Sequence, residues 1–382
     1  MIYLDHHATT PVDPAVLDAM LPYFTEHFGN AASTNHLIGR RAHDAVAKAR
    51  AQIAGLIGAH SRDIAFTSGA TESNNLALKG VAEAMRDRGR HLITLPTEHK
   101  SVRDSARHLE KQGWDVTFME VDEQGFVDVD ELAAAIRDDT VLVSVMWTNN
   151  ESGVHQDIEA IGAKCRERGV YFHCDASQGL GYLPLDVDAV PVDLVSFTAH
   201  KIYGPKGVGA IYTRRRNPRV NLVAQMDGGG HENGLRSGTL NVPSIAGFGA
   251  AAEIMGAQGQ DEAARLRTLR KKLYEGIAEN GGIQLNGPAL EQEDKRHPGN
   301  LNLSFDGVRG DELMLALSEF IAVSGGSACS SGSVNPSHVL TSMFDDAARA
   351  ASSVRFGLGR HTTEDEIDVA IETVTSALKR LR

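Results

Sequence analysis

Three residues whose side chains could take part in catalysis stand at the end of apolar runs of strand length, or within a few residues after it, in this sequence. Asp175 follows one run, and a carboxylate at a buried strand end is costly unless a cation or a strong donor pairs with it. Lys201 leaves a second run into a Gly-Pro turn, where desolvation would favour a neutral, nucleophilic amine. His99 follows a third run, and a lone histidine there fits a structural role as well as a chemical one. Lys206, farther along the same turn, has the pattern of a solvated lysine.

A turn of small residues at 68–73 follows a further apolar run and opens a helical stretch. Free backbone N–H groups and the positive end of a helix dipole make such a turn suitable for a phosphate. The alternative is a plain capping motif with Thr71 or Ser68 as the cap. Both interpretations stay open on the turn alone.

The pair formed by Lys201 and Asp175 favours one cofactor. Pyridoxal phosphate needs a lysine amine that bonds to its aldehyde and an acid that holds its ring nitrogen. The small-residue turn, His99, Asp175 and Lys201 follow one another in that order on successive predicted strands. We therefore predict a pyridoxal-phosphate site at the ends of these strands.

Strand-length apolar runs alternate with amphipathic stretches between residues 64 and 212. The predicted strands are 64–67, 92–95, 116–121, 141–147, 170–175, 194–197 and 208–212. The predicted helices between them are 72–86, 101–112, 129–137 and 158–168. This alternation predicts an α/β fold with a mostly parallel seven-stranded sheet covered by helices. Ligands of such sheets bind beyond the carboxyl ends of the strands.

The pattern changes after residue 244, where a long helical stretch to 280 leads away from the sheet. Beyond it, strands near 284, 301–305, 321–323 and 354–358 mix with helices, and 364–381 is helical. We expect a large α/β domain at 14–255. A smaller α+β domain, formed by 1–13 and 256–382, would carry Cys329 and Arg355.

Composition argues against nucleic-acid-binding, membrane and metal-binding functions. The 382 residues include 38 Lys and Arg against 50 Asp and Glu, a net charge of −12, which disfavours stable nucleic-acid binding. The first residues lack a secretory pattern, and no uncharged apolar run reaches about eighteen residues, so we expect a cytoplasmic protein without membrane contact. Cys165, Cys174 and Cys329 have no metal-type spacing, nor do the histidines, so we expect free thiols and no metal.

The ordered motifs resemble the NifS/IscS cysteine desulfurases, which belong to fold type I of the pyridoxal-phosphate enzymes and to aminotransferase class V. The resemblance runs nearly end to end. Its motifs are Leu4-Asp5 with Ala8-Thr9-Thr10, Gly29-Asn30, Thr67 to Ser73, Thr97-Glu98-His99, Asn149-Asn150-Glu151, Asp175 to Gln178, the Lys201 turn, Gly228 to Glu232, Arg236 to Thr239, and Ser327-Ala328-Cys329. His6 and His7 stand where the family generally has other residues.

The resemblance implies roles for individual residues. Lys201 would bind the cofactor covalently, and Asp175 would pair with its ring nitrogen. His99 would stack on the ring, while Asn150 and Gln178 would contact its edge and its phenolic oxygen.

It also implies a phosphate site and a substrate site. The phosphate would be held by Ala70, Thr71, Thr198 and His200, joined by Thr239 of the neighbouring subunit. Arg355, with Asn150 beside it, would bind the substrate carboxylate as a bidentate guanidinium. The catalytic residues would be Cys329, Lys201 and His99.

The implied reaction converts L-cysteine to L-alanine and leaves a persulfide on Cys329, whose neighbours are Gly and Ser. The implied assembly is a homodimer that supplies sulfur to an iron–sulfur scaffold or a tRNA-thiolation enzyme. Alternatives are a selenocysteine lyase, another pyridoxal-phosphate C–S lyase or aminotransferase, and a non-catalytic scaffold. For Cys165 and Cys174 we expect buried, inert thiols.

Overall fold

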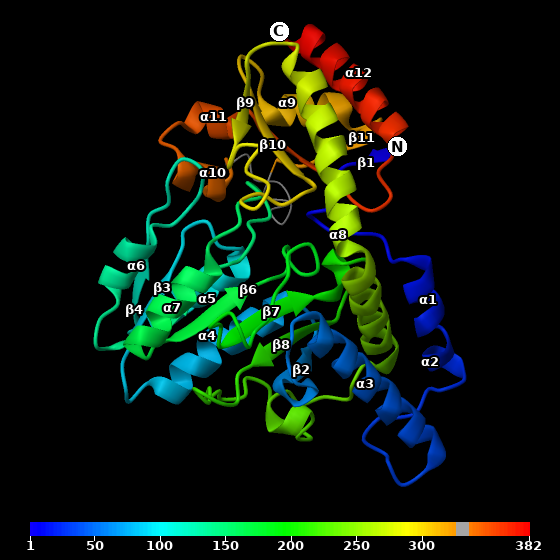
Figure 1. Ribbon diagram of the computed structural model, residues 1–382, viewed down its shortest axis with the longest axis vertical. Helices are drawn as coiled ribbons and strands as arrows, with labels where there is room; N and C mark the ends of the chain where they lie inside the picture. The colour runs from blue at the N-terminus through cyan, green and yellow to red at the C-terminus, as the bar shows by residue number, and fades with distance from the viewer. Residues whose placement is uncertain (326–335) are drawn as a thin grey trace.

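The computed structural model describes residues 1–325 and 336–382, and a seven-stranded sheet forms its larger part (Figure 1). The strands are β2 (Ile64–Thr67), β3 (His91–Thr94), β4 (Asp115–Phe118), β5 (Thr140–Ser144), β6 (Tyr171–Asp175), β7 (Leu194–Thr198) and β8 (Gly209–Thr213). Their order is β2-β8-β7-β6-β5-β3-β4, and β8 alone runs antiparallel to its neighbours. The predicted mostly parallel, seven-stranded sheet is confirmed.

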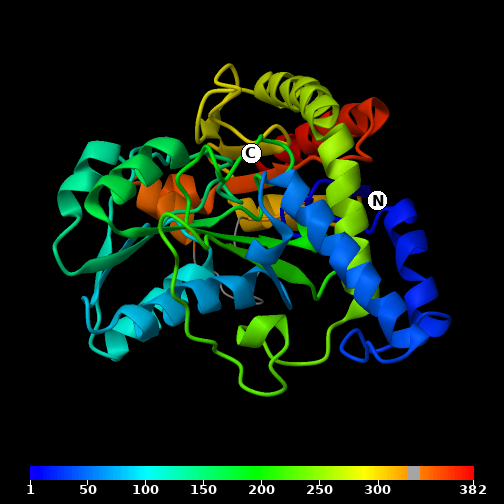
Figure 2. The ribbon, with the colours of Figure 1, turned by 60° about the horizontal axis from the view of Figure 1, so that its bottom comes forward.

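Helices cover both faces of this sheet (Figure 2). One face packs against α4 (Ala70–Met85) and α5 (Lys100–Lys111), and the other against α3 (Leu37–Leu56), α6 (Val129–Ala135), α7 (Ile158–Arg168) and α8 (Val242–Ala278). Successive strand residues such as Leu142 and Val143 are buried on opposite faces. This double burial explains why the strands are continuous apolar runs.

A smaller part contains two further sheets. An antiparallel sheet has the order β12 (Ser353–Gly357), β10 (Asn300–Phe305) and β9 (Ile283–Asn286), and β1 (Ile2–Tyr3) pairs in parallel with β11 (Ile321–Ala322). Its helices are α9 (Gly310–Leu317), α10 (His338–Met343), α11 (Ala347–Ala351) and α12 (Glu364–Leu381). Both chain termini lie in this part (Figure 1).

The helix α8 joins the two parts. Its 37 residues span roughly 55 Å at 1.5 Å per residue, and it runs from beside α3 up to α12 (Figure 1). The short helices α1 (Pro14–Met20) and α2 (Pro22–Thr25) pack beside its lower half. Within residues 1–325 and 336–382, 3-10 turns lie at Ser61–Asp63, Ala199–Lys201 and Glu232–Gly234.

Two predicted strands extend three residues past the observed ends. The predicted strand 141–147 ends as β5 at Ser144, although Val145 and Trp147 still donate backbone hydrogen bonds to β6 beyond the regular ladder. The predicted strand 116–121 ends as β4 at Phe118, because the chain then enters the turn closed by Asp122 and Phe126. The apolar runs therefore predicted burial correctly but extended past regular pairing.

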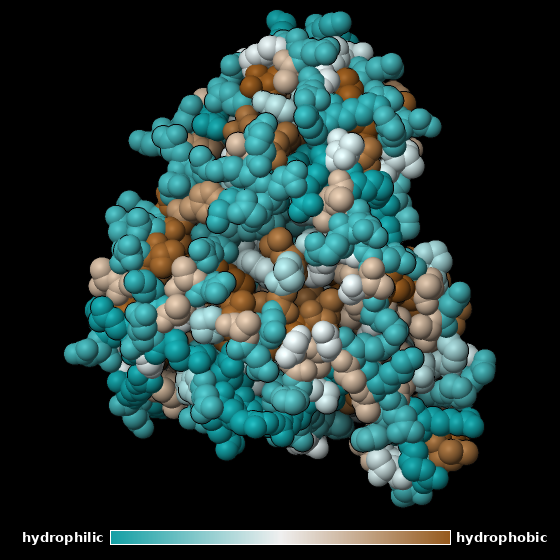
Figure 3. All heavy atoms as spheres, in the orientation of Figure 1, coloured by the Kyte–Doolittle hydropathy of each residue, from teal (hydrophilic) through white to brown (hydrophobic). Residues whose placement is uncertain are grey.

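The molecular surface is mostly hydrophilic on the face shown in Figure 3. Apolar side chains show in a band across the middle of that face, between the smaller part and the sheet. Within the described ranges, no helix is both long enough and apolar enough to span a bilayer.

Candidate active site

A cavity of about 550 Å³ lies at the carboxyl ends of the sheet strands. Its lining includes ten of the predicted site residues: Ala70, Thr71, His99, Asn150, Asp175, Gln178, Thr198, His200, Lys201 and Arg355. The structure thus brings together residues that follow five different strands and one residue of the smaller part. Two predicted residues are not among them. Thr239 is exposed on the surface and does not line this cavity, and Cys329 lies outside the described residues.

The start of α4 forms one wall and leaves its backbone donors open. Gly69 is the N-cap residue with φ of 150°, and no side chain caps the helix, so the capping role considered for Thr71 or Ser68 is absent. Gly209 of β8 lies so close that a Cβ there would stand 2.6 Å from the Cα of Gly69. Glycine at both positions therefore keeps the helix start free for an anion.

His200 and Thr198 line the wall beside this turn. The Nδ1 atom of His200 lies 3.1 Å from Thr9 Oγ1. Burial lowers the pKa of His200 to about 3, and the charge of Lys201 adds to the shift. The ring is therefore neutral at pH 7, so it offers a hydrogen bond and not a full charge.

Asp175 ends β6 and is 4% exposed. Its Oδ1 accepts hydrogen bonds from Ser177 N at 3.0 Å and Ser177 Oγ at 2.6 Å, and its Oδ2 accepts one from Asn74 Nδ2 at 2.7 Å. All three donors are neutral, so they orient the carboxylate without cancelling its charge. A cationic ring N–H of a ligand would complete the pairing that a buried carboxylate requires.

His99 is the N-cap residue of α5 and lines the cavity. Its Nδ1 accepts the backbone N–H of Ser101 at 3.2 Å and lies 2.8 Å from Ser101 Oγ. Ser101 Oγ in turn accepts a hydrogen bond from Asn74 Nδ2 at 2.8 Å. The ring of His99 is therefore fixed by Ser101 of α5, and Asn74 of α4 in turn donates to that serine.

Lys201 ends the 3-10 turn Ala199–Lys201 that follows β7. Its Nζ donates hydrogen bonds to the backbone carbonyls of Ala8, at 2.9 Å, and of His7. Tyr203, two residues on, has a left-handed φ of 65°, and its N–H donates to Thr10 Oγ1 at 3.0 Å. The segment at 7–10 thus holds the lysine turn from both sides.

Gln178 has both ends of its amide engaged by one residue. Its Oε1 lies 3.0 Å from His7 Nδ1, and its Nε2 donates to the His7 carbonyl at 3.0 Å. Burial lowers the pKa of His7 well below its usual value, so its ring is neutral. His7 therefore orients the amide predicted to face the cofactor's phenolic oxygen.

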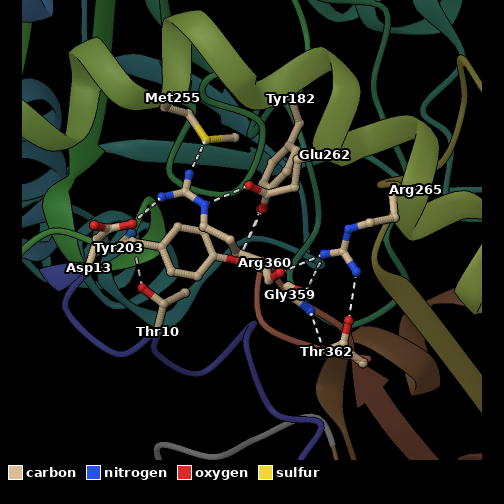
Figure 4. A network of polar contacts seen from close by, with 10 residues as sticks. All are labelled: Thr10, Asp13, Tyr182, Tyr203, Met255, Glu262, Arg265, Gly359, Arg360 and Thr362. Carbon is tan, nitrogen blue, oxygen red and sulfur yellow. Dashed lines mark hydrogen bonds and ion pairs between the residues drawn. The ribbon is translucent and has the colours of Figure 1, made fainter. Parts of the chain in front are cut away.

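A buried polar network links the lysine turn to the smaller part of the protein (Figure 4). The guanidinium of Arg360 donates to Glu262 of α8 at 2.8 Å and to Asp13 at 2.9 Å. It also lies 4.1 Å above the ring of Tyr203. Glu262 accepts further hydrogen bonds from Tyr182 at 2.6 Å and from Tyr203 at 3.2 Å. Arg360 therefore connects the end of β12 to the helix and the turn that position Lys201.

Replacing Arg360 with alanine is expected to reduce the free energy of unfolding by about 3–5 kcal/mol, because Glu262 would stay buried without its cation. Urea unfolding of the purified protein measures this. Arg137→Ala is the control: its ion pair with Asp115 is exposed, so the expected loss is about 1 kcal/mol or less. Equal losses in the two variants would contradict the assigned role of Arg360.

Arg355 lies on β12 and is 1% exposed. Its Nη2 donates to Asp5 Oδ1 at 2.7 Å, and its Nη1 donates to the Asn150 carbonyl at 2.8 Å. Its Nε is buried and has no partner among the described residues. Arg355 lines the cavity, so its guanidinium suits the carboxylate of a small ligand.

These residues fit pyridoxal phosphate. The uncapped helix start matches a phosphate, Asp175 matches a ring N–H, and the amine of Lys201 lies in the same cavity. Gln178 supplies an oriented amide for the phenolic oxygen. Each polar group of the cofactor, namely the phosphate, the ring nitrogen, the aldehyde and the phenolic oxygen, therefore has a residue or helix end in this site that could bind it.

Sequence reasoning missed several residues of this site. Asn74 and Ser101 orient Asp175 and His99, and the signal for them was a pair of polar residues on the buried faces of two amphipathic helices. Glu151 also lines the cavity: burial raises its pKa, and Ser337 donates a hydrogen bond to its Oε2.

Cys165 and Cys174 lie away from this chemistry. Both are buried, and burial raises the pKa of each thiol. Neither cysteine lines the cavity. They are therefore poorly suited to act as thiolates.

Comparisons with known proteins agree over nearly the whole chain. Residues 2–369 match the family model of aminotransferase class V. A cysteine desulfurase IscS of Anaeromyxobacter sp. (strain Fw109-5) is 54% identical over 384 residues, which cover 100% of this chain and 93% of the relative. IscS of Neisseria meningitidis serogroup C is 52% identical with the same coverage. A solved NifS-like protein is 36% identical with a TM-score of 0.91, covering 99% of each chain.

Proposed function

The chain belongs to the aminotransferase class-V family and is a pyridoxal-phosphate-dependent cysteine desulfurase, and from this premise we propose that it converts L-cysteine to L-alanine while Cys329 takes up the sulfur as a persulfide. The observation that carries the proposal is a single cavity lined by Lys201, Asp175, His99 and Arg355. These are the groups that the reaction needs for proton transfer, cofactor binding and carboxylate recognition.

Lys201 and Asp175 perform complementary tasks in this proposal. When bound, pyridoxal phosphate supplies an electron sink for the electrons of a broken Cα–H bond. Asp175 keeps a proton on the ring nitrogen, so that the developing negative charge meets a cation. Lys201 holds the cofactor and then takes the α-proton with its Nζ, and the carbonyls of His7 and Ala8 keep that atom inside the cavity. His99 would stack on the cofactor ring.

Cys329 performs the sulfur transfer. Its thiolate attacks the sulfur of the substrate, so that an S–S bond forms as the Cβ–S bond breaks. The proton that the thiol gives up ends on the new methyl group of alanine. The step balances without an added oxidant, because one thiol becomes a persulfide and one carbon–sulfur bond becomes a carbon–hydrogen bond.

Arg355 orients the substrate through its carboxylate, with Asn150 beside it. We expect Arg355→Ala to raise KM for cysteine by about 30-fold or more, since removing one partner of a desolvated ion pair costs roughly 2–5 kcal/mol. Steady-state kinetics measure this, and the bound cofactor's absorbance serves as the control for an intact site. An unchanged KM would mean that the carboxylate binds elsewhere.

Measuring the reaction products distinguishes a cysteine desulfurase from the alternative enzymes. Purified holoenzyme with L-cysteine and a thiol reductant should release sulfide and alanine in a 1:1 ratio. A C–S lyase without a persulfide would give pyruvate and ammonia, and an aminotransferase would need a keto-acid acceptor. Activity with selenocysteine but not with cysteine would favour a selenocysteine lyase, and no turnover at all would favour a scaffold.

We also propose that the enzyme is a homodimer in which Thr239 completes the partner's phosphate site. Thr239 is exposed and lies outside its own chain's cavity, while the nearby Arg236 pairs with Glu72 at 2.9 Å. Large apolar side chains are also exposed on α1, α2, the start of α3 and the segment before it, namely Leu17, Leu21, Phe24, Phe28, Leu37 and Ile38. Such a patch is suited to burial against a second copy.

Light scattering tests the dimer, and a fully active monomer would contradict it. A mixture of Lys201→Ala and Thr239→Val enzymes tests the shared site. Hybrid dimers should regain activity, because one of their sites combines an intact Lys201 with an intact Thr239 from the other chain.

The sulfur acceptor we propose is an iron–sulfur scaffold or a tRNA-thiolation enzyme in the cytoplasm, where reducing conditions keep the thiol of Cys329 available. Transfer of label from [35S]cysteine through Cys329 to each candidate protein distinguishes the two classes.

A further inference from the structure

We propose that Asn74 is a positioning residue that links Asp175, which would pair with the ring nitrogen of the cofactor, to His99 through Ser101, and this inference rests on the proposed function. Asn74 lies one turn into α4 and is fully buried. Its Nδ2 group donates to Asp175 Oδ2 at 2.7 Å and to Ser101 Oγ at 2.8 Å. One amide group thus uses its two hydrogens for two different parts of the site.

The acceptors fix which way this amide points. An ionised carboxylate has no hydrogen to give, so Asp175 requires the NH₂ end of Asn74 and not its oxygen. The opposite end, Oδ1, is buried and finds no partner among the described residues. An unsatisfied buried oxygen costs free energy, so this arrangement is not explained by stability alone. It is explained if the orientation of Asp175 and Ser101 serves the site.

The chain of donors continues to His99 and sets its tautomer. The backbone N–H of Ser101 points at His99 Nδ1 at 3.2 Å, and a backbone amide can only donate, so Nδ1 carries no proton when the ring is neutral. Ser101 Oγ already accepts from Asn74, which leaves its own hydrogen for the same Nδ1 at 2.8 Å. The single proton of the neutral ring therefore sits on Nε2.

The helix α4 consequently serves three sites on one rigid element. Its first turn offers open backbone donors beside Gly69, and one turn later Asn74 directs both Asp175 and, through Ser101, His99. A shift of this helix would move the phosphate site, the ring-nitrogen partner and the ring-stacking group together. The helix therefore holds the phosphate site, Asp175 and His99 at fixed positions relative to one another.

The test uses holoenzyme and reads the bound cofactor without turnover. In Asn74→Ala, Asp175 loses a donor and draws the ring proton more strongly, so the pH midpoint of the yellow absorbance should rise by at least about half a unit. Ser101→Ala removes the link to His99, so kcat should fall about tenfold or more with KM for cysteine changed less than about threefold. Ser105→Ala is the matched control, because its hydroxyl bonds to a backbone carbonyl on the same helix as Ser101.

A second variant separates positioning from packing. Asn74→Asp keeps the size of the side chain but sets a carboxylate against Asp175, so it should lose cofactor faster than Asn74→Ala does. The double variant Asn74→Ala with Ser101→Ala should lose less kcat than the two single losses combined predict, since both changes break the same series of hydrogen bonds from Asn74 through Ser101 to His99. If Asn74→Asp does not fold, Asn74→Ala and Ser101→Ala still decide the question.

The outcomes distinguish this inference from the function on which it rests. Unchanged absorbance and unchanged kcat in Asn74→Ala and Ser101→Ala would overturn the positioning role and leave the enzyme's function intact. An unaltered parent enzyme that binds the cofactor but releases no sulfide would overturn the function, whatever the absorbance of the variants shows.

Discussion

Replacing Lys201 with alanine is expected to remove the yellow absorbance of the lysine-bound cofactor and to lower kcat by at least about 10⁴-fold, while the protein stays folded. The loss should be this large because one side chain performs two tasks, holding the cofactor and moving the α-proton. Its Nζ donates hydrogen bonds to the backbone carbonyls of His7 and Ala8.

Absorbance spectroscopy and sulfide release measure the two losses separately. Borohydride reduction of the parent enzyme should fix the cofactor on the peptide that contains Lys201, which mass spectrometry can identify. Lys206→Ala is the control, because this lysine is exposed at the edge of the same turn and should leave the yellow absorbance in place. A Lys201→Ala enzyme with an unchanged visible spectrum would overturn the assignment.

Much of the fold could be predicted because the sheet is buried on both faces. Helices α7 and α12 begin and end at the predicted residues 158–168 and 364–381, where polar caps stand at clear breaks in the apolar pattern. The spatial order of the strands could not be predicted, since apolar runs of similar length are interchangeable until the connections between them are known. The domain boundaries at 13/14 and 255/256 stay a prediction, and α8 runs through the second of them.

The charged members of the site were easier to identify than the neutral ones. Burying the charge of Asp175 or Lys201 at a strand end costs free energy, so a charged residue beside an apolar run can be recognised in the sequence as a candidate site residue. Asn74 and Ser101 give no comparable signal, because a neutral polar residue inside an amphipathic helix is common and its partner comes from another helix. The pairing of Arg355 with Asp5 was hidden for a related reason, as 350 residues separate the two along the chain.

Cys329→Ser is expected to keep the yellow absorbance and its change on adding cysteine, yet to lower sulfide release by at least about 100-fold. The serine hydroxyl retains the shape of the side chain but cannot accept a sulfur atom to form a persulfide. Lys201, Asp175 and Arg355 stay intact in this variant, so cysteine should still bind and its α-proton should still exchange with solvent. Binding and sulfur transfer would thereby be separated in one protein.

The other two cysteines provide the matched controls. Cys165→Ser and Cys174→Ser should remain active, because both thiols are buried outside the cavity and burial raises the pKa of each. After incubation with cysteine in the absence of reductant, mass spectrometry should find an added sulfur on Cys329 alone. An added sulfur on either buried cysteine would contradict this assignment.

The described residues on either side of Cys329 support its role. Before it, the backbone of Ser324 pairs with that of Arg355, with a hydrogen bond of 2.7 Å from Arg355 N to Ser324 O. After it, Ser337 donates a hydrogen bond to Glu151. Arg355 and Glu151 both line the cavity, so Ser324 and Ser337 each lie beside a residue of the site. If sulfide release nonetheless survives in Cys329→Ser, carbon–sulfur cleavage does not need this thiol, and the enzyme is a lyase that frees sulfide directly.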